Sequence, residues 1–221
     1  PNVRTLTMGS GTWSGSAGYS SGYWTTSTTT NLTFNTNTST ISLLGSGGTF
    51  TGGGLTFNNL TLVSGTSIVD SKTFTALTMN GPVSKKGSIT LQTNQTVTGT
   101  FTIAGNSATN RLLVASYTLG TARTITNSGA TMTWSNVDFR DITLGTAFDA
   151  SAITGGAGDA GGNTSITFTT ATTRYWVGGT GSWSSTGEWS ATSGGASGAS
   201  VPLPQDDVVF DANSFSAGSQ T

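Results

Sequence analysis

The sequence contains neither cysteine nor histidine among its 221 residues. Without cysteine the fold has no disulfide and no thiolate metal site, and redox chemistry gives no information on its compartment. Without histidine it lacks the commonest general base and the commonest metal ligand of proteins. The two absences argue against a thiolate or imidazole metal centre and against histidine-based catalysis.

Charge is scarce as well. Eight basic and nine acidic residues make up 8% of the chain and give a net charge of -1. The basic residues are scattered from Arg4 to Arg174 and form no stripe, which disfavours counterion-driven binding of nucleic acid. No stretch approaches the ~18 apolar residues of a membrane-spanning helix, and no basic segment with an apolar one opens the chain. We therefore expect neither a nucleic-acid partner nor insertion into a membrane.

Short alternating runs of apolar residues and threonine are abundant, most clearly between residues 49 and 105. A period of two is the pattern of β-strands, and the Gly, Asn and Ser residues between the runs are typical of turns. The runs return every ~15–25 residues, which fits one turn of a solenoid in which each turn stacks on the last. The sequence therefore predicts an all-β fold, an elongated, right-handed, β-helix-like β-solenoid.

The pattern also predicts local features outside this stretch. Residues 112–125 form two strands around Gly120, and residues 132–139 form a strand with a kink near Asn136. We expect residues 155–163 (GGAGDAGGN) to form a loop. Because Asn and Gly tolerate positive φ, Asn58 and Asn59 are expected at a corner between strands, as is the pair at 80–81.

Two modules are expected along the chain. Residues 1–170 form the β-solenoid, and residues 171–221 form the Trp-containing opening of a second small β module. A weak internal repeat supports this division, because residues 11–13 and 181–183 both read Gly, Thr or Ser, Trp. In each copy a second Trp and a strand ending in Phe follow. Since the chain begins and ends within such patterns, we expect it to be a segment of a longer polypeptide.

Trp176, Trp183 and Trp189 are the candidate ligand-binding residues. Exposed indole rings stack on sugar faces, whereas burial in a small core is the alternative and the favoured structural explanation, because Trp combines a large apolar face with one polar group. The same alternatives apply to an aromatic group near the N-terminus, which we expect to cap the first turn of the solenoid. This group comprises Trp13, Tyr19, Tyr23 and Trp24.

Asp206, Asp207 and Asp211 are the candidate metal ligands. Hard cations such as calcium bind clustered carboxylate oxygens, although a solvated loop before a strand is the simpler explanation. Asp159 lies in a glycine-rich segment with a superficial likeness to the calcium-binding nonapeptide of β-rolls, but the spacing does not match. Calcium is the one cofactor considered for this chain.

Asp138, Arg140 and Asp141 form the densest charge cluster of the sequence. An exposed, salt-bridged edge is its simplest explanation. Polysaccharide hydrolases and lyases on β-helices need two or three acids at fixed spacing on one face, and this pair of aspartates is not diagnostic of such a site. We therefore expect no enzymatic activity and no catalytic residues.

Several segments resemble the repetitive β-solenoid modules of bacteriophage virion proteins of the tail and fibre type, and of bacterial surface adhesins. The segments that carry the resemblance are 49–60 (TFTGGGLTFNNL), 159–163 (DAGGN), 175–183 (YWVGGTGSW), 188–190 (EWS) and 206–211 (DDVVFD). They cover the ends and the middle of the chain and are more specific for architecture than for function. The resemblance implies a structural or adhesive protein and supplies no catalytic residues.

These features together predict a non-enzymatic structural and adhesive component of an extracellular assembly, most simply a phage tail, fibre or capsid-decorating protein. The alternative is a bacterial secreted or cell-surface adhesin. The expected partners are other copies or subunits of the virion or surface assembly and a host-surface glycan, and the expected location is the virion, the cell surface or the extracellular space.

Two further classes are less favoured. A polysaccharide-degrading β-helix enzyme is disfavoured by the scarcity of acids. An ice-binding protein would present regular Thr-x-Thr arrays, but the threonine triplets at 28–30, 36–38 and 96–98 do not recur at one constant spacing.

Overall fold

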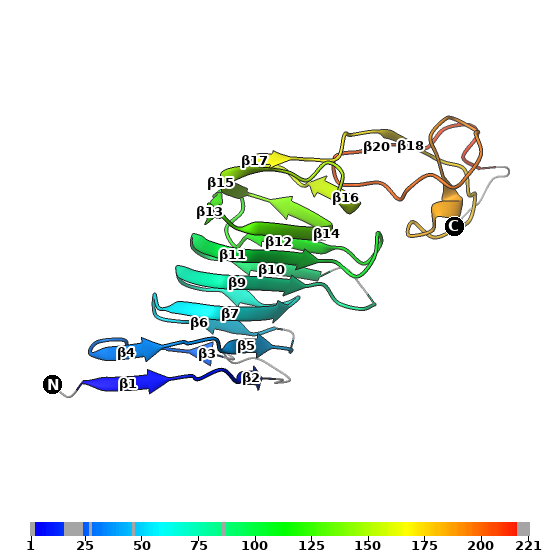
Figure 1. The fold of residues 1–221 in the computed structure, drawn as a ribbon. Coiled ribbons are helices and arrows are strands. Elements are labelled where there is room, and N and C mark those ends of the chain that lie inside the picture. Colours follow the sequence, from blue (N-terminus) through cyan, green and yellow to red (C-terminus); the bar gives the residue numbers. More distant parts are fainter. Residues whose placement is uncertain (1–2, 16–23, 27, 46, 85–86, 216–221) are drawn as a thin grey trace.

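A computed structural model describes residues 3–15, 24–26, 28–45, 47–84 and 87–215, and all statements below concern these residues. Strands make up half of the chain and helix about 2%, which confirms the predicted all-β class. The only helix of this part is a three-residue 3-10 turn, η1 (Thr186–Glu188). The dominant element is a curled sheet of stacked parallel strands, which is β-helix-like (Figure 1).

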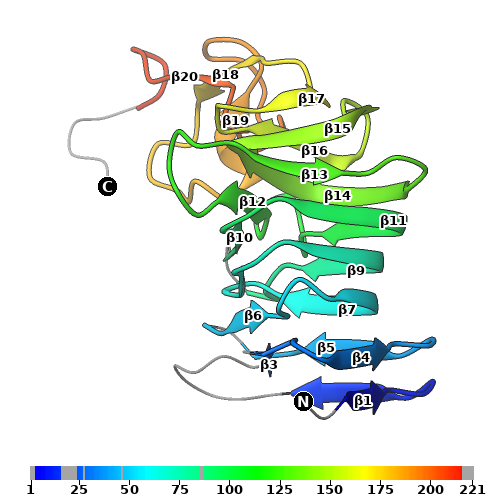
Figure 2. The same ribbon diagram turned by 90° about the vertical axis from the view of Figure 1, so that its left-hand side faces the viewer.

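The curled sheet has two walls that meet at one strand. The first wall runs in the order β2 (Thr12–Gly15), β5 (Thr40–Leu43), β7 (Thr56–Val63), β9 (Lys72–Asn80), β11 (Gln95–Ala104) and β14 (Thr131–Arg140). The second wall returns from β14 through β12 (Leu112–Ser116), β10 (Gly87–Leu91), β8 (Ser67–Ile68), β6 (Thr49–Thr51) and β3 (Trp24–Thr25). Every pair along both walls is parallel, and Figure 2 shows the strands stacked from the N-terminal end upward.

Shorter strands complete the stack at its two ends. At the N-terminal end, β1 (Arg4–Thr7) pairs in parallel with β4 (Leu32–Asn35) in a two-stranded sheet of their own, level with β2 and β5 in Figure 1. At the other end, β13 (Arg123–Thr126), β15 (Ile142–Asp149) and β17 (Thr164–Thr167) continue from β11, and β16 (Thr154–Asp159) pairs with β14. The predicted pair of strands around Gly120 is therefore confirmed as β12 and β13.

The core consists of apolar side chains that stack in register from one strand to the next. One such row is Ile41, Leu60, Leu77, Phe101 and Met132, and the next is Leu43, Leu62, Met79, Ile103 and Trp134. Apart from the half-buried Met132, all members are at most 6% exposed. Fully burying one such side chain contributes about 1.5–3 kcal/mol. The alternation seen in the sequence thus places one apolar residue of each strand above that of the strand before.

Asn136 produces the bend at which the two walls meet. It lies in the middle of β14 with φ of +48°, in the left-handed region that Asn tolerates better than most residues. Its amide Nδ2 donates to the carbonyl oxygen of Gly105 at 3.2 Å. The residues before the bend pair with β11, and those after it pair with β12. The kink predicted near this residue is confirmed.

Two local predictions hold only in part. The loop predicted for residues 155–163 is found at 160–163, but residues 154–159 form β16. Small residues are needed where this strand approaches β14, since a Cβ at Gly158 would lie 2.1 Å from Oδ1 of Asp138. The glycines therefore serve close packing between strands. Asn58 and Asn59 lie within β7 and not between strands, at the point where the alternation of buried residues shifts from Phe57 to Leu60. The Asn59 amide bonds to Oγ1 of Thr40 on the neighbouring strand at 3.2 Å.

The C-terminal residues form a separate three-stranded sheet. Its central strand β18 (Thr173–Trp176) pairs in parallel with β20 (Asp207–Val209) and antiparallel with β19 (Trp189–Ser190). Its own small core contains Trp176, Trp189 and Val201. The side chain of Gln205 connects this unit to the stack by accepting a hydrogen bond from the Asp159 N–H (2.9 Å) and donating to the Ala157 and Thr169 carbonyls.

Candidate functional site

Two of the three candidate tryptophans belong to the core of the C-terminal unit. Trp176 is 6% exposed and Trp189 is fully buried, and their rings meet edge to face at 5.0 Å between centroids. Their indole N–H groups donate to the backbone oxygens of Gly179 and Trp183, each at 2.9 Å. Because both rings are buried and both indole N–H groups are used internally, Trp176 and Trp189 follow the favoured explanation, burial in a small core, and are corrected as ligand-binding candidates.

Trp183 is the remaining candidate of this group, because it is 47% exposed. Its ring packs edge to face on Trp189 at 4.7 Å. Nearby, Phe210 and Phe215 are also exposed and stack almost in parallel, with centroids 6.1 Å apart. Sequence reasoning did not select these two phenylalanines, although each follows a strand or turn signal in the second module.

The three candidate calcium ligands are used separately and form no ion site. Asp206 accepts hydrogen bonds from the backbone N–H groups of Thr172 and Leu203, each at 2.8 Å. Asp207 starts β20, and Asp211 accepts from the Asn213 N–H at 2.8 Å. Hydrogen bonds from the Ser193 side chain and then from this N–H lower the pKa of Asp211.

No group of three acidic side chains in the described ranges is placed to hold a metal ion. The described residues therefore give no support to calcium at Asp206, Asp207 and Asp211, and the carboxylates of Asp206 and Asp211 accept from backbone N–H groups instead. Asp159 is used in the same way, since its Oδ1 accepts from the Gly161 N–H and the Asn163 amide at 2.8 and 2.7 Å.

Aromatic residues near the N-terminus pack on the first strands of the stack. Trp13 and Trp24 meet edge to face at 5.6 Å, and Trp24 continues the contact to Phe50 and Phe57. Trp13 is 40% exposed, whereas Phe50 and Phe57 are buried. This arrangement agrees with the expected cap for the two tryptophans. Tyr19 and Tyr23 lie outside the described residues.

The two aspartates of the predicted charge cluster are buried, and the main ion pair of Asp138 is made with Arg111, which was not part of the predicted cluster. Asp138 and Asp141 are 8% and 5% exposed, so the expected exposed edge is wrong. Asp138 pairs with Arg111, which lies 27 residues earlier: Nε of Arg111 donates to Oδ1 of Asp138 at 2.7 Å. Arg140 and Asp141 are adjacent, but their closest charged atoms are 3.7 Å apart.

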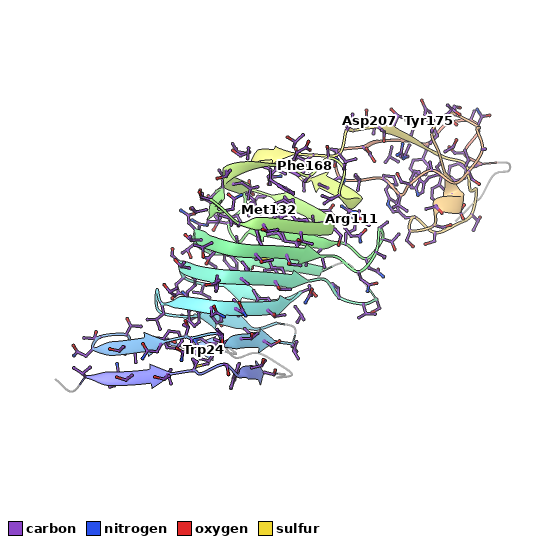
Figure 3. The ribbon with its side chains drawn as sticks, in the orientation of Figure 1. Trp24, Arg111, Met132, Phe168, Tyr175 and Asp207 are labelled. Carbon is purple, nitrogen blue, oxygen red and sulfur yellow. The ribbon has the colours of Figure 1, made fainter. Side chains whose placement is uncertain are left out.

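Arg111 joins three strands of the stack. Its guanidinium donates to the Val137 carbonyl on β14 (2.7 Å) and to the Gly155 and Gly156 carbonyls on β16 (2.5 and 2.8 Å). The residue itself precedes β12 and is 3% exposed. Figure 3 places it at the end of the stack that faces the C-terminal unit. The planar fork of donors suits such a role, since arginine can serve several acceptors at once.

A groove of about 360 Å³ lies beside this ion pair. It is lined by Gly87, Ser88, Arg111, Leu113, Asp138, Ala160 and Pro204. Ser88, Leu113 and Asp138 pair in register along β10, β12 and β14, and Pro204 reaches the groove from the C-terminal unit. The groove therefore lies where the stack and the C-terminal unit meet.

Lys72 is a second buried charge. Its side chain is inaccessible, and its ammonium contacts the Asp70 carboxylate. Oδ1 and Oδ2 of Asp70 accept from the Gly52 and Gly54 N–H groups at 3.1 and 3.3 Å. Burial lowers the pKa of Lys72 from its ordinary value of 10.5 to about 8.

Sequence reasoning missed Arg111 because its partner is not set by local spacing, and missed Lys72 although its partner Asp70 is only two residues away. Asp138 is distant from Arg111 in sequence, and only the register of β12 on β14 brings the two together. A lone charged residue next to an apolar strand is a weak signal of such a bond, because charged residues are rarely fully buried unless paired.

Comparison with protein-family models, with curated proteins and with solved structures returns no match. No helix in the part of the chain that the structure describes has the length and apolar character needed to cross a membrane. The resemblance to phage and adhesin modules stays a prediction.

Proposed function

We propose that this chain is a right-handed β-solenoid that acts as a rigid structural and adhesive component of an extracellular assembly, with a phage virion as the favoured setting. The observation that carries the proposal is the row-by-row stacking of apolar residues through β5, β7, β9, β11 and β14. A stack held by contacts between neighbouring strands extends in one dimension and gives reach with little chemistry.

The surface of the first wall supports this role. Its outward positions carry Thr, Ser, Asn, Ala and Val, and the charged residues of the wall lie outside these rows. A neutral, hydroxyl-rich surface suits contact with other subunits or glycans and not with phosphates or lipid headgroups. The resemblance of segments 49–60 and 175–183 to phage and adhesin modules favours the same class.

The experiment that tests the proposal is detection of the chain in purified particles. Mass spectrometry of virions from the host culture, combined with antibody labelling in electron microscopy, should find the chain on the tail, fibre or capsid surface. Detection on the bacterial envelope without particles would assign the chain to a cell-surface adhesin. Detection only inside the cytosol would refute both settings.

A second candidate function, ice binding, is favoured by the register of the first wall. Two outward rows run across six strands, Thr12, Thr40, Asn59, Ala76, Thr100, Thr131 and Ser14, Ser42, Thr61, Thr78, Thr102, Thr133. Loops of different lengths separate the members, which is why constant sequence spacing did not reveal them. The rows repeat about every 4.8 Å between strands and about 6.6 Å along them.

The hydroxyls of the second row are free to order water. Thr61, Thr78, Thr102 and Thr133 have no side-chain hydrogen bond to the described residues. The second wall offers no such lattice, because its row Thr49, Ser67, Thr90, Ala115, Arg140 ends in a charge and contains a Thr90–Ser67 hydrogen bond of 3.0 Å. A two-dimensional hydroxyl array suits a partner that is itself periodic.

Thermal hysteresis and ice recrystallisation assays test this candidate. The native chain should slow recrystallisation, and Thr78→Tyr should abolish the effect because the ring breaks the flat array. Thr49→Tyr, an outward change on the second wall, is the matched control and should keep it. A native chain that behaves like an inert globular protein in both assays would remove ice binding and leave the structural proposal intact.

A further inference from the structure

We propose that the groove beside the Arg111–Asp138 pair binds one residue of a neutral glycan. The inference rests on the proposed adhesive function and assigns that function to a site. It moves the contact away from Trp176 and Trp189, which are core residues, to the place where the stack meets the C-terminal unit.

The groove contains polar atoms that the protein leaves without partners. Oδ1 of Asp138 accepts from Nε of Arg111, but no described residue donates to its Oδ2. Asp138 lines the groove, and 11% of its side chain is exposed there. The Ser88 hydroxyl, which lies on the same face, likewise has no hydrogen bond to the described residues. Oδ2 of Asp138 is not among the buried atoms without a partner, so it is open to the groove, where a ligand hydroxyl can donate to it in place of water.

The charge of the groove favours a neutral ligand. The Arg111 guanidinium balances the Asp138 carboxylate, and no other charged side chain lines the groove among the described residues. An acidic sugar would face Asp138, and an ammonium group would face Arg111. Sugar hydroxyls can both donate and accept, so one hydroxyl can bond Asp138 while its neighbour bonds Ser88.

The walls and the size of the groove suit a pyranose ring. Leu113, Ala160 and Pro204 supply apolar surface for the C–H groups of a sugar. The volume of about 360 Å³ lies at the lower end of small-molecule sites, which run from ~300 to ~1,000 Å³. Ligand sites form preferentially at junctions between units, and here Pro204 brings one side of the groove from the C-terminal unit.

Nuclear magnetic resonance titration of the full chain tests the inference. The probes are the methyl glycosides of glucose, galactose, mannose and N-acetylglucosamine, with glucuronic acid and glucosamine as charged comparisons. At least one neutral glycoside should show saturation transfer and shift the amides of Ser88, Leu113 and Ala160. Ser88→Phe fills the groove and should abolish these shifts.

Thr90→Phe is the matched control, because Thr90 lies two residues further on the same face of β10 and does not line the groove. It should retain binding. Asp138→Asn, which keeps the shape but weakens the acceptor, should reduce affinity about tenfold. Its fold is checked by the unchanged amide spectrum of β7 and β9.

Three results would overturn the inference: no neutral glycoside shifts the groove amides, shifts map to Trp183 instead, or only the charged comparisons bind. The proposed function is judged separately by the presence of the chain in particles. A chain that is incorporated in virions but binds no glycoside at the groove would refute the site alone. Absence from virions and envelopes, with glycoside binding intact, would refute the assembly role alone.

Discussion

Replacing Arg111 with lysine should loosen the end of the stack next to the C-terminal unit. The native guanidinium makes four hydrogen bonds, to the Asp138 carboxylate and to the carbonyls of Val137, Gly155 and Gly156. A lysine ammonium is a point charge on a flexible stem and lacks the planar fork. It can keep the ion pair with Asp138 and at most one of the carbonyl contacts.

The expected loss follows from the acceptors that remain without a donor. Each buried acceptor left unsatisfied costs about 1–3 kcal/mol. Two carbonyls on β14 and β16 lose their partner, so Arg111→Lys should lower the free energy of unfolding of this end by about 3 kcal/mol. Arg111→Met removes the charge altogether and should lower the free energy of unfolding further, because the Asp138 carboxylate is then unpaired. Breaking a buried ion pair in this way costs about 3–5 kcal/mol.

Hydrogen exchange measured residue by residue is the suitable assay, because stacked repeats open locally as well as globally. Arg111→Lys should speed exchange of the Ala157 and Asp159 amides and leave those of β7 unchanged. Arg140→Lys is the matched control, because the Arg140 side chain is a third exposed and its ion pair with Asp141 is loose, with 3.7 Å between the charged atoms. It should cost less than about 1 kcal/mol. Equal effects of the two substitutions would refute the assigned role of Arg111.

Further predictions concern other parts of the chain. The pKa of Lys72 is about 8 in the folded chain and near 10.5 in the unfolded chain, so the unfolded chain binds more protons between these pH values. The free energy of unfolding, measured with urea, should therefore rise by about 1–2 kcal/mol from pH 8 to 10.5. Lys72→Met should flatten this rise. Trp189→Ala should lower the melting temperature by many degrees, as truncation of a buried Trp costs about 3–5 kcal/mol, whereas Trp183→Ala should change it little; equal shifts would contradict the burial. Gln205→Ala should remove three hydrogen bonds that join the C-terminal unit to the stack, so that limited proteolysis cuts the linker after β17 faster. Gln92→Ala is the control. Unchanged cleavage of the Gln205 variant would show that Gln205 does not hold the units together.

Much of the stack could be predicted from alternation alone. Residues such as Leu60 and Leu62 alternate with polar neighbours, and a strand with one apolar face has only one way to bury it. The strands of segment 49–105, the pair around Gly120 and the bend at Asn136 follow from this rule and from the backbone preferences of Gly and Asn.

The site could not be predicted in the same way. Arg111, Asp138 and Ser88 come from three strands, and their meeting depends on the register between β10, β12 and β14. Register is set by the total length of each intervening loop, which no local pattern encodes. Residues 154–159 were missed for a related reason: their glycines suit a loop by propensity, but the close approach of Asp138 at Gly158 requires them in a strand.

Charged residues are scarce in this chain, and two of its aspartates lie at connections between strands. Lys72 and Asp70 lie where β8 leads into β9, and Asp70 also holds the turn after β6 through Gly52 and Gly54. Asp141 follows β14 and accepts from the Gly120 N–H in the turn between β12 and β13, at 3.0 Å.

In both places a charged side chain bonds the backbone of a different strand connection, whereas Arg111 bonds carbonyls within the strands β14 and β16. The regular rows need no such bond, because each apolar residue is covered by the next strand. The irregular connections have backbone groups without a ladder partner, and a charge-assisted hydrogen bond is the strongest one available to satisfy them. Outward threonines of the rows should therefore tolerate substitution, whereas the charged residues at the connections should not. Asp70 and Asp141 thus bond connections, whereas Asp138 lies within β14, where its second carboxylate oxygen faces the proposed glycan groove.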